Sequence, residues 1–280
     1  MNAILRTFAV AFATLLPLSA FPAESVAFVT NVKGEVAVDG VPRPVLMSEL
    51  AKGQRINVAK EGQLAVMYVQ SGKEYVLKGP GDYSVGEREI TSASGMPPSA
   101  RETPWRANNQ VLVKVAQTSS ASIRMRSIAP AKPEPMPPLE FPTQGSVTTL
   151  QPTLRWAAPA AGVPVEVSIA PAASEGRPVA KAKVTGVTWR VPQKLQAGTE
   201  YAWSVTAGGR EIGSARFRTV DAATQQAVEK RRPTDKSEFT DRVLFALYLQ
   251  EVGAIQESRE AWGRLAQERA DLPELASLAK

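Results

Sequence analysis

The sequence predicts a multidomain, mainly β protein with an all-β N-terminal domain, a β-sandwich and a short α-helical C-terminal tail. Three observations favour this fold class. Short runs of β-branched residues alternate with turn residues in two separate parts of the chain. A proline-rich stretch lies between those parts, and after residue 220 the apolar spacing changes from two to about 3.6. With 280 residues, the chain is long enough for more than one buried core.

Residues 1–23 have the layout of a secretory signal peptide. Arg6 precedes about a dozen apolar positions, and small residues follow at Ala20 and Ala23. The sequence therefore predicts export to the periplasm. An uncleaved anchor is the alternative, although the apolar run is shorter than the ~20 residues that a spanning helix needs. No later segment is long or apolar enough to span a membrane.

Residues 24–91 are expected to form the first β domain. Two β-branched runs are interrupted at Gly34 and end at the turn pair Asp39 and Gly40, where both residue types tolerate a positive φ. The run from Leu64 to Val69 is apolar on both faces, which is typical of a strand in the middle of a sandwich or roll. A turn at Ser71 and Gly72 and another at Gly79 to Gly81 bound the next strand.

This domain resembles the FecR-like domain of bacterial envelope proteins. The matching residues are Val29, Val32, Gly34, Val36, Val38 and Gly40, then Gly53 and Ile56, then Gly79, Pro80 and Gly81. The resemblance implies a β module that occurs in regulators of iron-uptake signalling and in other envelope proteins.

Residues 92–142 are predicted to be a connector, basic at first and then rich in proline. Its basic part carries the candidate polymer-binding residues Arg101, Arg106, Arg124 and Arg126, which point to an acidic envelope polymer or to a solvated linker. From Ala129 to Pro142, six of fourteen residues are proline. We expect this part to join neither a sheet nor a helix, because proline fixes φ and lacks a donor, and to act as a semi-rigid spacer.

Residues 143–220 are expected to form a β-sandwich. Trp156 is an early buried aromatic residue, and Val165, Val167 and Ile169 alternate on one face of a strand. Tyr201, Trp203 and Val205 also share one face, as core residues or as a platform for a ligand. Tyr201 stands at the spacing of a tyrosine corner, in which the hydroxyl bonds to the backbone a few residues upstream. Together these features resemble a fibronectin type III domain, with Ala197 where that family usually has proline.

Residues 221–280 show helical periodicity. Asp221 to Arg232 suggests one helix. A second is expected to begin in a capping-box-like pattern at Asp235 and Glu238 and to stop at Gly253. A third, with Ser258, Trp262 and Leu265 on one stripe, is expected to end before Pro273.

The last two of these helices resemble one tetratricopeptide repeat, with Ala270 where the repeat often has proline. A single repeat cannot bury its own apolar face. Phe245, Leu249 and Trp262 must therefore be covered by another surface, either the helix at Asp221 to Arg232 or a protein partner. We take these three residues as candidate partner-binding residues.

The composition excludes several kinds of chemistry. The chain has no cysteine and no histidine, which removes disulfides, thiol and histidine nucleophile systems and histidine-held zinc. Gly79, Gly81 and Gly86 lack the lysine of a phosphate-binding loop. We therefore expect no enzyme, no cofactor and no metal. The sequence favours a periplasmic scaffold that docks a protein partner through its helical tail; the alternative is a cell-wall or anionic-polymer binding module.

Overall fold

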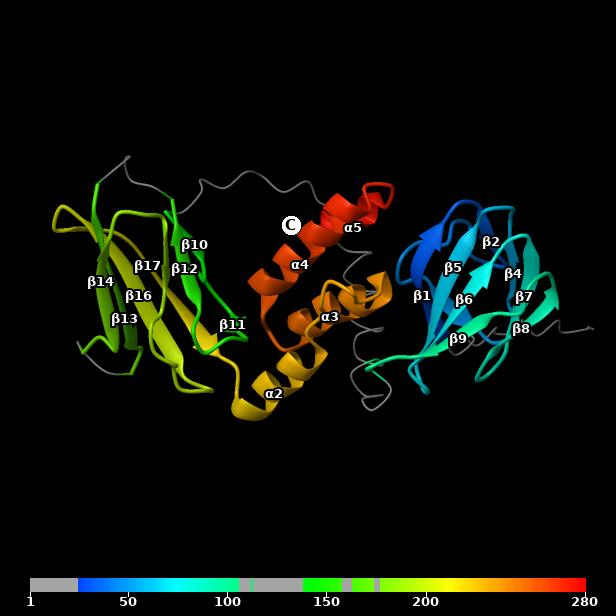
Figure 1. Ribbon diagram of the computed structural model, residues 1–280, viewed down its shortest axis with the longest axis horizontal. Helices are drawn as coiled ribbons and strands as arrows, with labels where there is room; N and C mark the ends of the chain where they lie inside the picture. Colours follow the sequence, from blue (N-terminus) through cyan, green and yellow to red (C-terminus); the bar gives the residue numbers. More distant parts are fainter. Residues whose placement is uncertain (1–24, 106–111, 113–137, 158–162, 174–176) are drawn as a thin grey trace, which may run out of the picture.

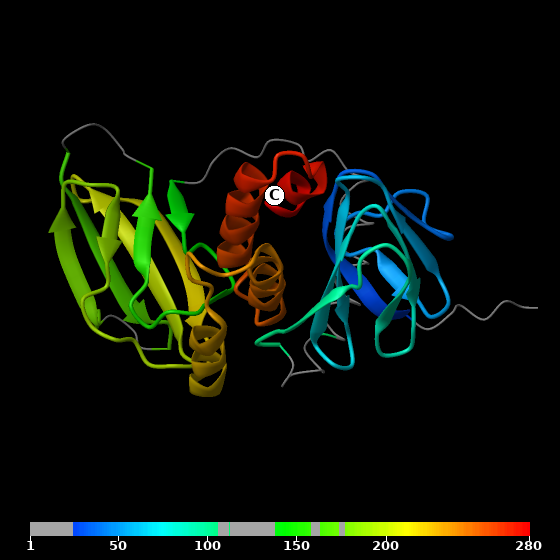
Figure 2. The ribbon, with the colours of Figure 1, turned by 45° about the vertical axis from the view of Figure 1, so that its right-hand side comes forward.

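The computed structural model describes residues 25–105, 112, 138–157, 163–173 and 177–280 (Figure 1). Over these residues the protein is mainly β, as predicted, with four sheets and the helices α2 to α5. Figures 1 and 2 both show a β unit at each end of the molecule and the helices between them. The predicted signal peptide lies outside the described residues.

The N-terminal β domain consists of two antiparallel sheets, in the orders β3-β1-β5-β6-β9 and β2-β4-β7-β8. Its strands are β1 (Ser25–Lys33), β2 (Val36–Val38), β3 (Glu49–Ala51), β4 (Arg55–Val58), β5 (Gln63–Tyr68), β6 (Lys73–Lys78), β7 (Gly81–Val85), β8 (Ile90–Ser94) and β9 (Ser99–Glu102).

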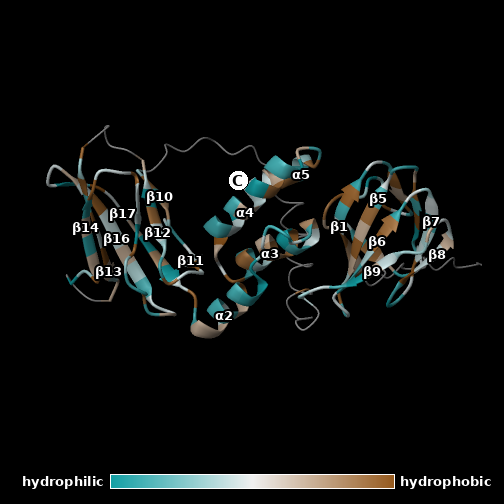
Figure 3. Ribbon diagram, viewed as in Figure 1, coloured by the Kyte–Doolittle hydropathy of each residue, from teal (hydrophilic) through white to brown (hydrophobic). Residues whose placement is uncertain are grey.

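The strands β1 and β5 are buried on both faces, as the apolar pattern of Leu64 to Val69 predicted. Val29 pairs with Val66, and both side chains enter the core between the two sheets. The neighbouring pair, Phe28 and Met67, belongs to a different core that includes the C-terminal helices. Figure 3 shows hydrophobic segments along β1, β5 and β6. The larger sheet is therefore a middle layer, covered by strands on one side and by helices on the other.

The second sandwich pairs a three-stranded sheet, β10-β12-β15, with a five-stranded sheet, β11-β17-β16-β13-β14. Its strands are β10 (Leu139–Phe141), β11 (Ser146–Val147), β12 (Thr153–Trp156), β13 (Val165–Pro171), β14 (Ala180–Val184), β15 (Thr188–Arg190), β16 (Glu200–Ala207) and β17 (Arg210–Thr219).

The row Tyr201, Trp203 and Val205 lies in the core of this sandwich, so the core interpretation of these residues is confirmed. The Tyr201 hydroxyl accepts a hydrogen bond from the Gln196 backbone N–H at 2.9 Å, which is the contact expected of a tyrosine corner. The indole N–H of Trp203 donates to the Pro142 carbonyl at 2.7 Å. No face of this row is open to a ligand.

The strands extend into the range predicted as a connector. β9 adds an edge strand to the N-terminal domain, and β10 pairs with β12. The expectation that Ala129 to Pro142 joins no sheet is therefore wrong for Leu139–Phe141. Between Pro138 and Pro142 these three residues keep their N–H groups, and Leu139 and Phe141 are buried. The rest of the proline-rich part lies outside the described residues.

The C-terminal helices are α2 (Ala222–Arg231), α3 (Phe239–Glu251), α4 (Ile255–Glu268) and α5 (Pro273–Leu278). Gly253, at φ 79°, ends α3 as predicted, because that conformation favours glycine. Asp235 does not cap α3, which begins four residues later, after Glu238. Instead, Thr234 and Ser237, each one position before the predicted pair, exchange two hydrogen bonds in a turn. The short helix α5, which begins at Pro273, was not predicted.

Candidate interaction sites

The predicted partner-binding residues Phe245, Leu249 and Trp262 are buried, at 5%, 2% and 1% exposure. They belong to one core that joins residues of all four helices to residues of the N-terminal β domain. The Arg232 guanidinium also lies over the Phe245 ring, 5.7 Å from its centre. The chain itself therefore covers these side chains, and they do not form an open apolar groove.

The N-terminal part of the chain supplies the cover that sequence reasoning did not foresee. Trp105 packs edge-on against Tyr248 of α3, with ring centres 5.6 Å apart. The Arg231 guanidinium lies over both rings, 5.6 Å and 5.4 Å from their centres. Several residues from strands, loops and the start of the connector enter the same core: Phe28, Leu46, Met47, Met67, Trp105 and Leu112.

A buried charged cluster joins β6 and β9 to the first turn of α3. Glu74, 3% exposed, accepts from the guanidinium of Arg101 and from the hydroxyls of Thr30 and Thr240. Arg101 also donates to Asp241 at 2.8 Å. Burial alone would lower the pKa of Arg101, but the hydrogen bonds and charges of Asp241 and Glu74 raise it. The cluster is thus a charged contact between the β domain and the tail.

Of the four predicted polymer-binding residues, Arg101 lies within the described part of the chain. Arg101 carries two carboxylate partners inside the molecule, so its charge is compensated before any external polymer approaches. Arg106, Arg124 and Arg126 lie outside the described residues. The structure thus brings none of the other three arginines together with Arg101 within its described part.

A second polar contact anchors the end of α4 to β1. Arg269 donates to the Asn31 side-chain oxygen at 2.5 Å and to the Val32 carbonyl at 2.7 Å. Asp271 pairs with the same guanidinium at 2.7 Å, and this pairing raises the pKa of Arg269. Glu274 of α5 accepts a bond from the Leu46 N–H at 3.4 Å.

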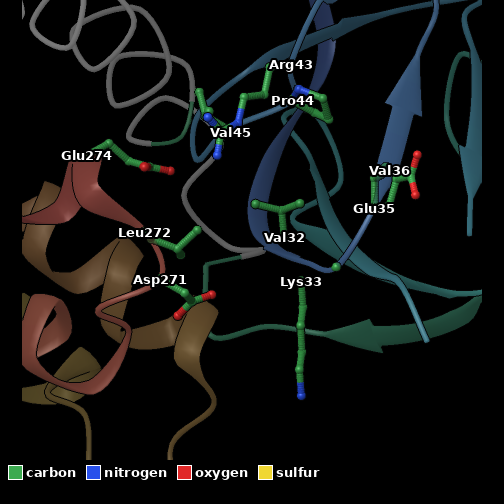
Figure 4. Close-up of a pocket in the computed structure, with 11 residues that line it drawn as sticks. Val32, Lys33, Glu35, Val36, Arg43, Pro44, Val45, Asp271, Leu272 and Glu274 are labelled. Atoms are coloured by element: carbon green, nitrogen blue, oxygen red, sulfur yellow. The ribbon is translucent and has the colours of Figure 1, made fainter.

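A cavity of about 390 Å³ lies along this seam (Figure 4). Its β-domain wall includes Val32, Val36 and Val45, and its helical wall is Asp271, Leu272 and Glu274. Figure 4 shows the two carboxylates extending toward the β domain, while the Lys33 side chain extends away. Both ends of the chain contribute, so the cavity exists only when the tail is docked.

The second sandwich carries an exposed basic face. Lys181 and Lys183 of β14 and Arg216 and Arg218 of β17 are exposed at its two sides. Between them, the outward residues of β13 and β16 are mostly small: Ser168, Ala170, Ala202 and Ser204. Three strand spacings separate the basic sides, or about 14 Å. Glu166 pairs with Lys181 at 2.8 Å, and the exposed Glu200 of β16 lies in register with Arg218, so acidic side chains offset part of the charge. We call this surface the basic sheet face.

Two features are absent from the residues that the structure describes. They contain no group of three or more acidic side chains placed to hold a metal ion. None of the helices α2 to α5 is long and apolar enough to cross a membrane.

Comparisons with known proteins give no independent assignment for this chain. No protein-family model matches it, and no curated protein does.

Proposed function

We propose that the protein is a non-catalytic scaffold of the bacterial envelope, exported to the periplasm, in which the helices fix the placement of two β modules. The shared core of Phe28, Met67 and Trp262 carries this proposal, because it joins both ends of the chain into one unit. The apolar segment of residues 1–23 supports export. The second sandwich is then an insertion within the N-terminal unit.

The family resemblances fit this arrangement. We infer that the N-terminal domain is FecR-like, that the second sandwich is fibronectin type III-like, and that α3 and α4 are one tetratricopeptide-like hairpin. The contact from Tyr201 to Gln196 supports the second of these inferences. In repeat arrays a neighbouring repeat covers the apolar face; here the N-terminal domain takes that place.

A protein partner is proposed to meet the cavity at the seam between the N-terminal domain and α5, since Phe245, Leu249 and Trp262 are already covered. Its volume of about 390 Å³ is adequate for one or two inserted side chains. A partner would bind there only when the tail is docked, because residues of the N-terminal domain and of the tail both line the cavity.

Crosslinking in intact cells tests this proposal with tagged full-length variants. Val45→Arg places a long charged side chain in the cavity and is expected to abolish capture of the partner. Val187→Arg is the matched control, because Val187 is 43% exposed on the second sandwich. Equal capture by both variants and the unaltered protein would exclude the seam as the docking site.

An anionic polymer is a second candidate partner, favoured by the basic sheet face. The double substitution Lys181→Glu with Lys183→Glu should strongly weaken binding to isolated cell-wall polymer. Lys52→Glu with Lys60→Glu makes the same charge change on the N-terminal domain and should leave binding intact. Binding should also weaken as salt rises, because exposed charges are screened within ~8 Å at physiological ionic strength. Salt-insensitive binding would contradict this candidate.

A further inference from the structure

The helical segment has two interfaces that differ in kind. Toward the N-terminal domain it shares one apolar core. Toward the second sandwich it shares none among the described residues, because the core of that sandwich contains only its own strands and loops. The contacts there are hydrogen bonds and an ion pair. Such contacts exchange for bonds to water with a small net free energy, so this docking is the weaker of the two.

A polar row on the first turns of α4 makes the contacts to the second sandwich. Gln256 accepts from the Thr143 N–H at 2.7 Å and donates to the Glu140 carbonyl at 3.0 Å. One turn later, Glu260 forms an ion pair with Arg155 of β12. Just before α4, the Gly253 carbonyl accepts from the Ser146 N–H at 2.9 Å.

Glu257 lies at the centre of this row. One carboxylate oxygen accepts from the Thr148 N–H at 2.9 Å, and the other accepts from the Thr148 hydroxyl at 2.5 Å. Thr148 is 1% exposed, so this pair of bonds is withdrawn from water. Val220 and Asp221 join the sandwich directly to α2, so two residues separate the last strand from the helix.

The charged groups around Glu257 come from two helices and one strand. Arg232, at the end of α2, pairs with Glu229 at 2.7 Å and lies 3.5 Å from the Thr148 hydroxyl. Arg155 of β12 pairs with Glu260. Glu257, Arg232, Glu260 and Arg264 line a second cavity, of about 400 Å³, beside Thr148. The residues of α3 that line it, Phe245 and Leu249, are uncharged.

We propose that the second sandwich docks reversibly on α4 and that protonation of Glu257 tightens this docking. A protonated Glu257 keeps both bonds to Thr148, since one oxygen still accepts from the N–H while the other donates to the hydroxyl. Protonation also removes the cost of holding a carboxylate away from water, and the repulsion by Glu260. Arg232 loses one acidic neighbour and retains Glu229.

The direction of the pH effect follows from the pKa of Glu257. Burial has the largest effect and raises this pKa, and the charge of Glu260 raises it further. The hydrogen bonds from Thr148 and the charge of Arg232 lower it by less, so the pKa of Glu257 lies above its ordinary value. In the undocked state the side chain is in water and has its ordinary pKa. The docked state therefore binds more protons between the two values. The stabilisation is complete below the ordinary pKa and is lost as the pH rises through the raised one.

Energy transfer between two dyes on the full-length chain measures the docking. The chain has no cysteine, so Lys60→Cys in the N-terminal domain and Lys194→Cys in the second sandwich provide two labelling positions, both exposed. Between about pH 8 and about pH 5, the docking constant should rise by at most about tenfold for each unit of pH, as one titrating group allows. Transfer efficiency should rise accordingly.

The variant Glu257→Gln mimics the protonated side chain. Its transfer efficiency should be high and independent of pH, and the unaltered protein should approach that value in acid. Glu211→Gln, a matched change on the exposed surface of β17, should retain the pH dependence. The proposal is overturned if Glu257→Gln and the unaltered protein show the same pH profile, or if transfer in the unaltered protein does not change.

Discussion

Arg101 is the residue whose surroundings differ most from the sequence-based expectation. It was placed in a solvated basic connector, but it lies on β9, in register with Glu74 of β6. The four residues of β9 have too little alternation to predict a strand. The acidic partner in α3 lies 140 positions further along the chain. No local pattern links residues so far apart, so the charged cluster could not be predicted.

Replacing Arg101 with alanine tests the charged cluster. The carboxyl groups of Glu74 and Asp241 would then lose their shared cation at a largely buried interface. Removing one partner of a buried ion pair costs about 3–5 kcal/mol, and the partial exposure of Arg101 favours the lower end of that range. Urea unfolding measures the loss. Lys52→Ala removes the exposed pair with Glu87 and should leave the midpoint unchanged; equal effects of the two substitutions would refute the role given to Arg101.

Two glycines give opposite predictions for the same substitution. A Cβ at Gly79 would overlap the Ala59 carbonyl, whereas one at Gly263, inside α4, would meet nothing within 4 Å. Gly79→Ala should therefore destabilise the protein by about 3 kcal/mol or more. Gly263→Ala should stabilise it by up to about 1 kcal/mol, because alanine favours the helix. Thermal unfolding of both variants checks this, and a tolerated Gly79→Ala would show that the turn at Gly79 to Gly81 can shift.

Among the elements, those with strong periodicity were predicted and those defined by tertiary contacts were not. Helices α2, α3 and α4 could be predicted because the sequence of each contains a helix start signal, a stop signal or a stripe of residues at helical spacing. The strand β10 is hidden between prolines, and α5 consists of only six residues. The pattern on both faces of β5 predicted a central strand correctly. It did not tell which segment covers the second face, since any apolar surface would satisfy it.

Removing residues 233–280 tests whether the helices cover the second face of β1 and β5. The sandwich at residues 139–220 should stay folded, because its core contains no helix residue. The N-terminal domain would expose Phe28, Met47 and Met67, and the truncated protein should bind a hydrophobic dye and aggregate. Near-ultraviolet circular dichroism reports the packing of Trp156 and Trp203, and dye fluorescence reports the exposed surface. A soluble truncated protein without dye binding would contradict the shared core.

For the whole molecule, the sequence predicted consecutive domains, and the structure instead joins the two ends of the chain. Leu46 and Glu274 are 228 positions apart and share a hydrogen bond. Residue patterns give the period of a helix but not the identity of its distant neighbour. β9 lies after residue 91 and β10 before residue 143, and each depends on pairing with a strand found elsewhere in the chain.

This organisation predicts two unfolding transitions. Trp262→Ala should lower the midpoint of the N-terminal unit and its helices together, with a loss of about 3–5 kcal/mol, because it opens a cavity in their common core. The second sandwich should unfold at an unchanged midpoint. Phe217→Ala should lower the midpoint of the second sandwich and leave that of the N-terminal unit and its helices unchanged. Calorimetry with hydrogen exchange separates the two transitions, and a single transition lowered by both substitutions would show that the units are coupled.

The core shared between β1 and α4 also sets an order of events during synthesis. The ribosome completes all nine strands of the N-terminal domain before it begins the second sandwich, yet the cover for β1 and β5 is made last. The nascent chain therefore carries an open apolar sheet while the sandwich, whose contacts are nearer in sequence, can already close. A chaperone that holds the early strands until α4 emerges would suit this chain.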